Sequence, residues 1–272
     1  MIPTVSQICC LNSPFETDIE DFAAGHCRSV EIWLTKLETY LQNHTLEDVR
    51  DLLKRFEVQT PVASFQGGLL ASQGERRSEA WESFTKRLDL CQAVGIGTLV
   101  VACDVPGPLV QSTIDRVQQS MVQAAQEAGK RGLRIAVEFQ SNSAFGNNLQ
   151  TLAALVGEVG SPHLGICLDA FHWHCGPSKL EDLGYLNPGN LFHVQLCDVA
   201  DTVRELATDS QRIMPGEGDI PIAALLEGLK QVGYAGTVSL ELMNPQLWQI
   251  PARQLGEIGM TSLRKLLGQA QM

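Results

Sequence analysis

The sequence lacks the features that mark membrane-spanning and nucleic-acid-binding proteins. No apolar run approaches the roughly 18 residues that a membrane-spanning helix needs. Basic residues occur in runs of at most two, such as Arg76-Arg77, and the formal net charge is −11. A protein that follows phosphates needs clustered Lys and Arg, so this charge balance argues against a nucleic-acid partner. The sequence therefore predicts neither a membrane nor a nucleic-acid association.

The chain also lacks the cysteine pattern of a disulfide scaffold. None of its eight cysteines forms a Cys-x-x-Cys pair, and Cys103, Cys167 and Cys197 lie in apolar runs. Buried reduced thiols behave as small hydrophobes and are typical of a reducing compartment. Residues 1–4 carry no basic segment and lead into no long apolar core, so no signal peptide is expected. These features predict a cytoplasmic protein.

No Gly-x-Gly-x-x-Gly follows any strand candidate, which removes the main support for a dinucleotide-binding fold. Short apolar runs instead alternate with helix-like segments. The strand candidates are residues 5–11, 29–34, 58–65, 98–103, 133–138, 164–168, 191–196 and 237–240. The helix candidates are residues 18–25 (with Asp18 as its cap), 46–56, 78–94, 109–128, 149–159, 180–186, 222–232 and 255–267.

This alternation predicts the fold class. Wholly apolar strands that alternate with helices indicate a parallel sheet covered by helices. Eight such repeats in 272 residues favour a closed (β/α)8 TIM barrel over an open sheet. No linker or low-complexity stretch interrupts the pattern, so we expect a single domain over residues 1–272.

The stretch Gly165–His174 is the most informative one in the chain. A short apolar run ends at Asp169, and His172 follows three residues later. In a barrel of parallel strands, the residue at the carboxyl end of a strand faces the active-site mouth. The alternative interpretation is that Asp169 caps a turn and that His172 packs against Trp173.

Four consecutive strand tips carry groups that can bind a metal. They supply Glu138, then Asp169, then His193 or Gln195, then Glu241. The two-residue period of a strand places Gln195 level with the three carboxylates and His193 one layer below. An oxygen-rich set of this kind suits one Mn²⁺ or Mg²⁺ ion and tolerates Co²⁺ or Zn²⁺. The alternative is a salt-bridged polar mouth without metal.

Five motifs in the second half of the chain resemble the xylose isomerase-like TIM barrel family of sugar phosphate isomerases and epimerases. They are residues 137–139, 168–172, 193–198, 212–219 and 233–241. The resemblance implies a metal held by Glu138, Asp169, the strand-seven residue and Glu241. Many family members carry His where this chain has Gln195. Related lyases similar to 3-dehydroshikimate dehydratase carry Gln there, so Gln195 can ligate through its carbonyl oxygen.

The resemblance also implies catalytic roles. As in the ketose 3-epimerases, Glu138 and Glu241 would flank the substrate, one removing the proton beside a carbonyl and the other returning it. His172 would polarise an oxygen or move a proton, unless it is a packed core histidine. Arg212 would contact substrate oxygens. His193, Trp33 and Lys179 are further candidates for substrate contact; Glu31 and Gln66 are either mouth-lining or structural, and His174 is expected to be structural.

Four functional hypotheses follow. The first is a metal-dependent isomerase or epimerase of a small sugar, sugar phosphate or polyol. The second is a lyase with the same chemistry that ends in loss of water, from dehydroshikimate or an inosose. The third, an apurinic endonuclease, normally needs more than the six histidines present and a basic groove. The fourth is a non-catalytic sugar-binding barrel. The substrate, the native metal and a homo-oligomeric assembly stay open.

Overall fold

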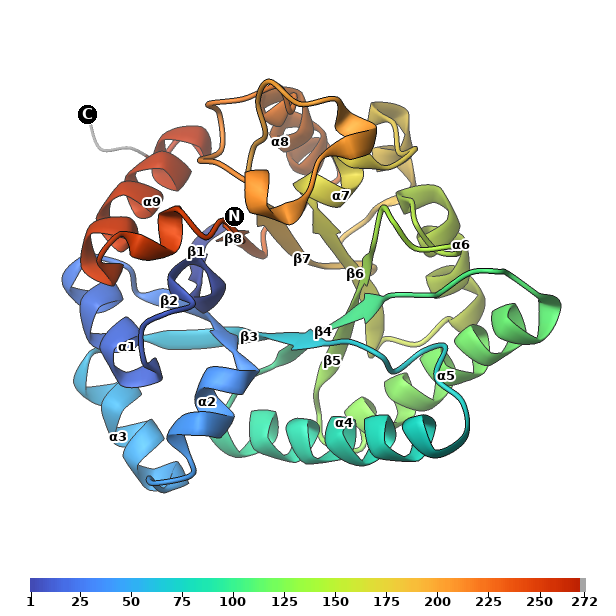
Figure 1. The fold of residues 1–272 in the computed structure, drawn as a ribbon, viewed down its shortest axis with the longest axis horizontal. Helices are drawn as coiled ribbons and strands as arrows, with labels where there is room; N and C mark the ends of the chain where they lie inside the picture. The colour runs from blue at the N-terminus through green and yellow to red at the C-terminus, as the bar shows by residue number, and fades with distance from the viewer. Residues whose placement is uncertain (270–272) are drawn as a thin grey trace.

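The computed structural model describes residues 1–269 and shows a closed barrel of eight parallel strands in sequence order, with helices around it (Figure 1). The strands are β1 Ile2–Ser6, β2 Ser29–Trp33, β3 Gln59–Gln66, β4 Thr98–Cys103, β5 Arg134–Phe139, β6 Leu164–Asp169, β7 Leu191–Leu196 and β8 Thr237–Leu240. Parallel pairing between β8 and β1 closes the barrel. The predicted (β/α)8 TIM barrel is confirmed.

The helices cover the outside of the barrel and bury their apolar faces against it. They are α1 Phe15–Ala24, α2 Leu34–Tyr40, α3 Leu46–Arg55, α4 Gly74–Val94, α5 Gln111–Gly129, α6 Leu149–Val159, α7 Ala170–Cys175, α8 Ile222–Gln231 and α9 Ala252–Leu266. Short 3-10 turns are η1 Gln7–Cys10, η2 Leu180–Tyr185, η3 Arg204–Leu206, η4 Asp209–Gln211 and η5 Leu247–Gln249. No helix within residues 1–269 combines the length and the apolar character that crossing a bilayer requires.

The amino-terminal segment differs from the sequence-based expectation. The first strand ends at Ser6, because the Ser6 side chain accepts the Ile8 N–H and starts the turn η1. The expected strand over residues 5–11 was therefore wrong in its bounds, since a short apolar run fits a buried strand and a buried turn equally well. Asp18 does not cap α1, which begins at Phe15; its buried carboxylate instead lies 2.6 Å from the Lys36 ammonium.

Two short helices that the sequence pattern does not predict, α2 and α7, begin directly at strand tips. The β6 tip matters most for function, because α7 turns the chain back over the barrel there. In the register between β6 and β7, Asp169 lies opposite Gln195. Deeper in the barrel, Gly165 leaves space for the ring of Phe192, which a Cβ at Gly165 would approach to 2.6 Å. The interior is thus packed below the site and polar at its carboxyl end.

Candidate active site

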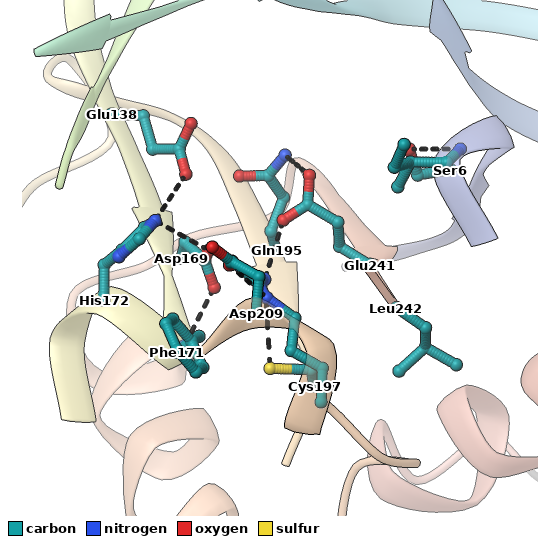
Figure 2. A network of polar contacts seen from close by, with 12 residues as sticks. Ser6, Glu138, Asp169, Phe171, His172, Gln195, Cys197, Asp209, Glu241 and Leu242 are labelled. Atoms are coloured by element: carbon teal, nitrogen blue, oxygen red, sulfur yellow. Dashed lines mark hydrogen bonds and ion pairs between the residues drawn. The ribbon is translucent and has the colours of Figure 1, made fainter. Parts of the chain in front are cut away.

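Three side chains from β5, β6 and α7 converge at the mouth of the barrel. Glu138, Asp169 and His172 each offer a ligand atom, and these atoms lie within 4.8 Å of one another. His172 Nε2 lies 3.6 Å from Glu138 Oε1 and 3.8 Å from Asp169 Oδ2. All three side chains are buried, and Figure 2 shows them pointing toward one another. This cluster could hold a metal ion.

Asp169 has a structural role and a site role at once. Its Oδ1 accepts the Phe171 N–H at 2.8 Å, so it caps α7, while its Oδ2 faces His172 and Arg212. Capping at this position starts α7, and one helical turn then brings the side chain of His172 back over the strand tip. The expected turn-capping role of Asp169 is therefore confirmed, and the same side chain also lies in the cluster at the mouth.

The environment of His172 determines its protonation state. Burial is the main cause that lowers the pKa of His172 below its ordinary value, so the ring is neutral near pH 7. The backbone N–H of Ser141 lies 3.3 Å from Nδ1 and can only donate, so Nδ1 is the acceptor nitrogen. The neutral ring therefore carries its proton on Nε2, facing Glu138 and Asp169.

Gln195 and Glu241 complete the ring of strand tips. Gln195 Nε2 donates to Glu241 Oε1 at 2.8 Å and to Glu31 Oε1 at 3.0 Å (Figure 2 shows the contact with Glu241). Gln195 Oε1 accepts from Cys167 Sγ at 3.0 Å. These contacts join the tips of β7 and β8 and fix the position of the Glu241 carboxylate.

Arg212 reaches into the site from the loop between β7 and α8. Its Nη2 lies 2.7 Å from Asp169 Oδ2 and its Nη1 lies 2.8 Å from Glu241 Oε2. Asp209, on the same loop, accepts from Nε at 2.9 Å and from Nη2 at 2.7 Å. The guanidinium also stacks on the Phe171 ring at 4.5 Å. Arg212, only 1% exposed, thus binds carboxylates of the protein itself.

Two of the carboxyl groups that line the pocket, those of Glu138 and Glu241, resist ionisation. Burial, followed by the charge of Asp169, raises the pKa of Glu138 well above its ordinary value. Burial likewise raises the pKa of Glu241, although Arg212 opposes it. Among residues 1–269, no hydrogen-bond donor is found for the Glu138 carboxylate. A buried carboxylate without a donor favours a cation beside it, so the cluster of Glu138, Asp169 and His172 fits a divalent metal ion. The carbonyl oxygen of Gln195 accepts from Cys167, and its amide group faces Glu241.

A second polar layer lies under the strand tips. Glu31 is fully buried, with Oε2 3.1 Å from His193 Nε2, and it accepts from the Ser64 hydroxyl. Burial acts to raise the pKa of Glu31, but the neighbouring His193 and the hydroxyl groups of Ser239 and Ser64 together outweigh it, and the pKa is lowered. His193 Nδ1 lies 2.7 Å from Thr237 Oγ1. His193 and Glu31 therefore contact each other below the mouth instead of lining it.

The pocket above this network has a volume of about 250 Å³, which is small compared with the roughly 300–1,000 Å³ of pockets for drug-sized ligands. Its lining residues are Trp33, Phe65, Glu138, Gln140, His172, Asp209, Arg212, Glu241 and Met243. Five of the sequence candidates thus line one pocket. Lys179 is exposed and lies outside this lining, and Gln66 lines a neighbouring hollow.

Sequence reasoning missed four lining residues: Phe65, Gln140, Asp209 and Met243. Phe65 stacks on Trp33 with ring centroids 5.5 Å apart and planes 5° apart, and together they form an apolar wall. Phe65, Gln140 and Met243 lie at or just beyond the ends of β3, β5 and β8, and this position in the sequence could have identified them as residues near the mouth. Asp209 lies in a long loop, and nothing local in the sequence marks it.

Comparison with known proteins assigns the chain to a family. The model of the xylose isomerase-like TIM barrel family matches residues 22–266. An inosose isomerase from Halalkalibacterium halodurans is 27% identical over 248 residues, which cover 89% of this chain and 88% of that protein. A 3-dehydroshikimate dehydratase from Pseudomonas putida is 28% identical over 282 residues, covering 100% of this chain but only 42% of the longer relative.

A solved structure shows the same fold. The crystal structure of the IOLI protein with a binding zinc atom superposes with a TM-score of 0.92 at 22% identity, and the match covers 100% of both chains. The barrel, the cluster at its mouth and the matched residues lead to one conclusion. This chain belongs to the xylose isomerase-like TIM barrel family.

Proposed function

We propose that this protein is a divalent-cation-dependent lyase that removes the proton beside the carbonyl of a small cyclic polyol ketone and then expels a hydroxyl group as water. The observation that carries this proposal is the grouping of Glu138, Asp169 and His172 in one small buried pocket. The relatives, an inosose isomerase and a 3-dehydroshikimate dehydratase, support this lyase alternative better than the sugar epimerase preferred from the sequence. Both relatives are named for cyclic ketones that carry hydroxyl groups.

The metal would be held by Glu138, Asp169, Gln195 and Glu241, the four strand-tip residues. When bound, a divalent cation supplies an electrophile for the carbonyl oxygen and helps to orient the substrate. Mn²⁺ and Mg²⁺ suit the oxygen-rich donors, and zinc is the metal named for the structural relative.

Glu138 is the proposed base. Among the residues that the structure describes, none donates a hydrogen bond to its carboxylate, whereas Glu241 accepts from Arg212 and Gln195. Its raised pKa makes it a stronger base near neutral pH. It takes the proton from carbon and then gives that proton to the departing hydroxyl, which leaves as water. The Nε2–H of His172 donates a hydrogen bond to a substrate oxygen and so positions the ring beside Glu138.

The apolar wall of Trp33 and Phe65 completes the pocket. A polyol ring has a face of C–H groups, which packs on aromatic rings, while its hydroxyl groups turn toward the carboxylates. His193 lies in the second layer, where it holds Glu31 below Gln195. The single domain over residues 1–272 and the cytoplasmic location stay predictions of the sequence, and a homo-oligomeric assembly stays open.

The test is solvent deuterium incorporation. Inosose and 3-dehydroshikimate are incubated with the protein and Mn²⁺ in D₂O, and exchange at carbon and loss of water are followed by NMR. We expect exchange together with an unsaturated product from at least one of the two ketones, and loss of both signals in Glu138→Gln. Exchange without loss of water would replace the lyase by an isomerase. Metal bound at the site with no exchange of any substrate in the panel would refute enolisation.

A further inference from the structure

The guanidinium of Arg212 has no N–H group left for a ligand. A guanidinium carries five N–H donors. Nε donates to Asp209, Nη1 to Glu241 and to Cys197 Sγ, and Nη2 to Asp169 and Asp209. These five contacts use all five donors. An anionic group on a substrate would have to break one of these buried ion pairs before it could bind Arg212.

No other cationic side chain within residues 1–269 lines the pocket. Lys36, a buried lysine three residues after Trp33 in the chain, is paired with Asp18 at 2.6 Å. Lys179 is exposed and lies outside the pocket lining. Arg87 donates to the Phe65 carbonyl oxygen, and its Nε and Nη2 lie 2.7 and 2.9 Å from the carboxylate oxygens of Glu38. The pocket therefore offers an anion no free positive charge from the protein.

Negative charge surrounds the same space. Glu138, Asp209 and Glu241 line the pocket, and Asp169 lies directly beneath. Four carboxyl groups thus surround the pocket, whereas the Arg212 guanidinium is the one cationic group among the lining residues. Like charges placed close together in a desolvated site repel strongly, so this environment discriminates against anionic substrates.

We infer that the pocket selects an uncharged cyclic polyol ketone and rejects sugar phosphates and ring carboxylates. This inference rests on the proposed function and narrows its substrate class. The electrically neutral wall of Trp33, Phe65 and Met243 takes the C–H face of the ring, and the carboxylates accept hydrogen bonds from neutral hydroxyl groups. Of the two ketones named by the relatives, the neutral inosose fits this pocket, and dehydroshikimate with its ring carboxylate does not.

A pair of ligands that differ in charge and by one methyl group tests the inference. Shikimate and methyl shikimate share one carbon ring and three hydroxyl groups, and their binding to the Mn²⁺-loaded protein is followed by quenching of tryptophan fluorescence, because Trp33 lines the pocket. We expect the neutral ester to bind at least about tenfold more tightly than the acid. Equal binding, or tighter binding of the acid, would overturn the inference.

A variant pair shows whether the pocket charges cause the preference. Asp209→Asn removes one pocket carboxylate and loosens the hold on Arg212, so we expect the preference for the ester to shrink several-fold. Glu205→Gln is the matched control, because this exposed residue removes the same charge from the same loop outside the pocket. An unchanged preference in Asp209→Asn would overturn the electrostatic cause. The binding measurement does not depend on turnover. If deuterium exchange fails but the protein still prefers the ester, only the proposed function is refuted.

Discussion

Arg212 and Asp169 form an ion pair inside the protein, with Nη2 2.7 Å from Oδ2 and side chains that are 1% and 0% exposed. Charges removed from water to this degree are stable only when each has its partner. The pair joins the loop after β7 to the tip of β6, and Glu241 on the other side of the guanidinium extends the connection beyond β8. The geometry of the site therefore depends on a single cation supplied by the chain itself.

Replacement of Arg212 by Met should destabilise the protein by about 3–5 kcal/mol, because it leaves Asp169 and Glu241 buried without a cationic partner. Urea unfolding followed by circular dichroism measures this loss. The control is Arg253→Met, whose exposed pair with Glu257 should contribute less than about 1 kcal/mol. A similar small loss in both variants would show that the buried network is not needed for stability.

Addition of Mn²⁺ should raise the melting temperature of the metal-free protein. A ligand present at 100 times its Kd stabilises the folded state by about 2.7 kcal/mol. Glu138→Gln and Asp169→Asn should each lose most of this shift, whereas Glu227→Gln, on the exposed surface of α8, should keep it. Differential scanning fluorimetry after chelator treatment gives the comparison. An equal shift in all variants would place the metal elsewhere.

Acid should destabilise the metal-free protein through His172. Burial lowers the pKa of His172 in the folded state below the ordinary value of 6.5. Below that pH the His172 side chain binds a proton in the unfolded chain but not in the folded chain. The free energy of unfolding therefore falls as the pH falls below about 6.5. His172→Gln should flatten this part of the stability curve, measured by urea unfolding between about pH 5 and 7. A curve that is unchanged by the substitution would contradict the assignment.

The thiols should be unreactive in the native protein. Burial raises the pKa of Cys10, Cys91 and Cys103 to about 12 in each case, so almost no thiolate exists at pH 8. Cys175 is half-buried, with its pKa raised by burial to about 11, and should react first. Labelling with a chromogenic disulfide should be slow before denaturation and reach eight thiols after it. Rapid labelling of several thiols in the native state would contradict this burial.

Much of the fold could be read along the chain because it depends on local patterns. The apolar runs at residues 98–103, 191–196 and 237–240 match β4, β7 and β8 residue for residue. Strand tips in a parallel barrel share one end, so Glu138 and Asp169 could be placed together before any coordinates. The turn η1 could not be predicted, because a short apolar run does not distinguish a strand from a buried turn.

The sequence by itself indicated the barrel, its family motifs and the row of acidic strand tips. Each strand–helix repeat, each motif and each strand end is visible in a short stretch of the chain. Only the tertiary structure decided the partners of the buried charges. In the folded chain, Asp18 pairs with Lys36 and Glu31 pairs with His193. Every N–H donor of the Arg212 guanidinium contacts a side chain of the protein itself. The physical reason is that most of these partners lie far apart in the sequence. Barrel closure and loop packing bring them together, and no local sequence pattern indicates the pairing.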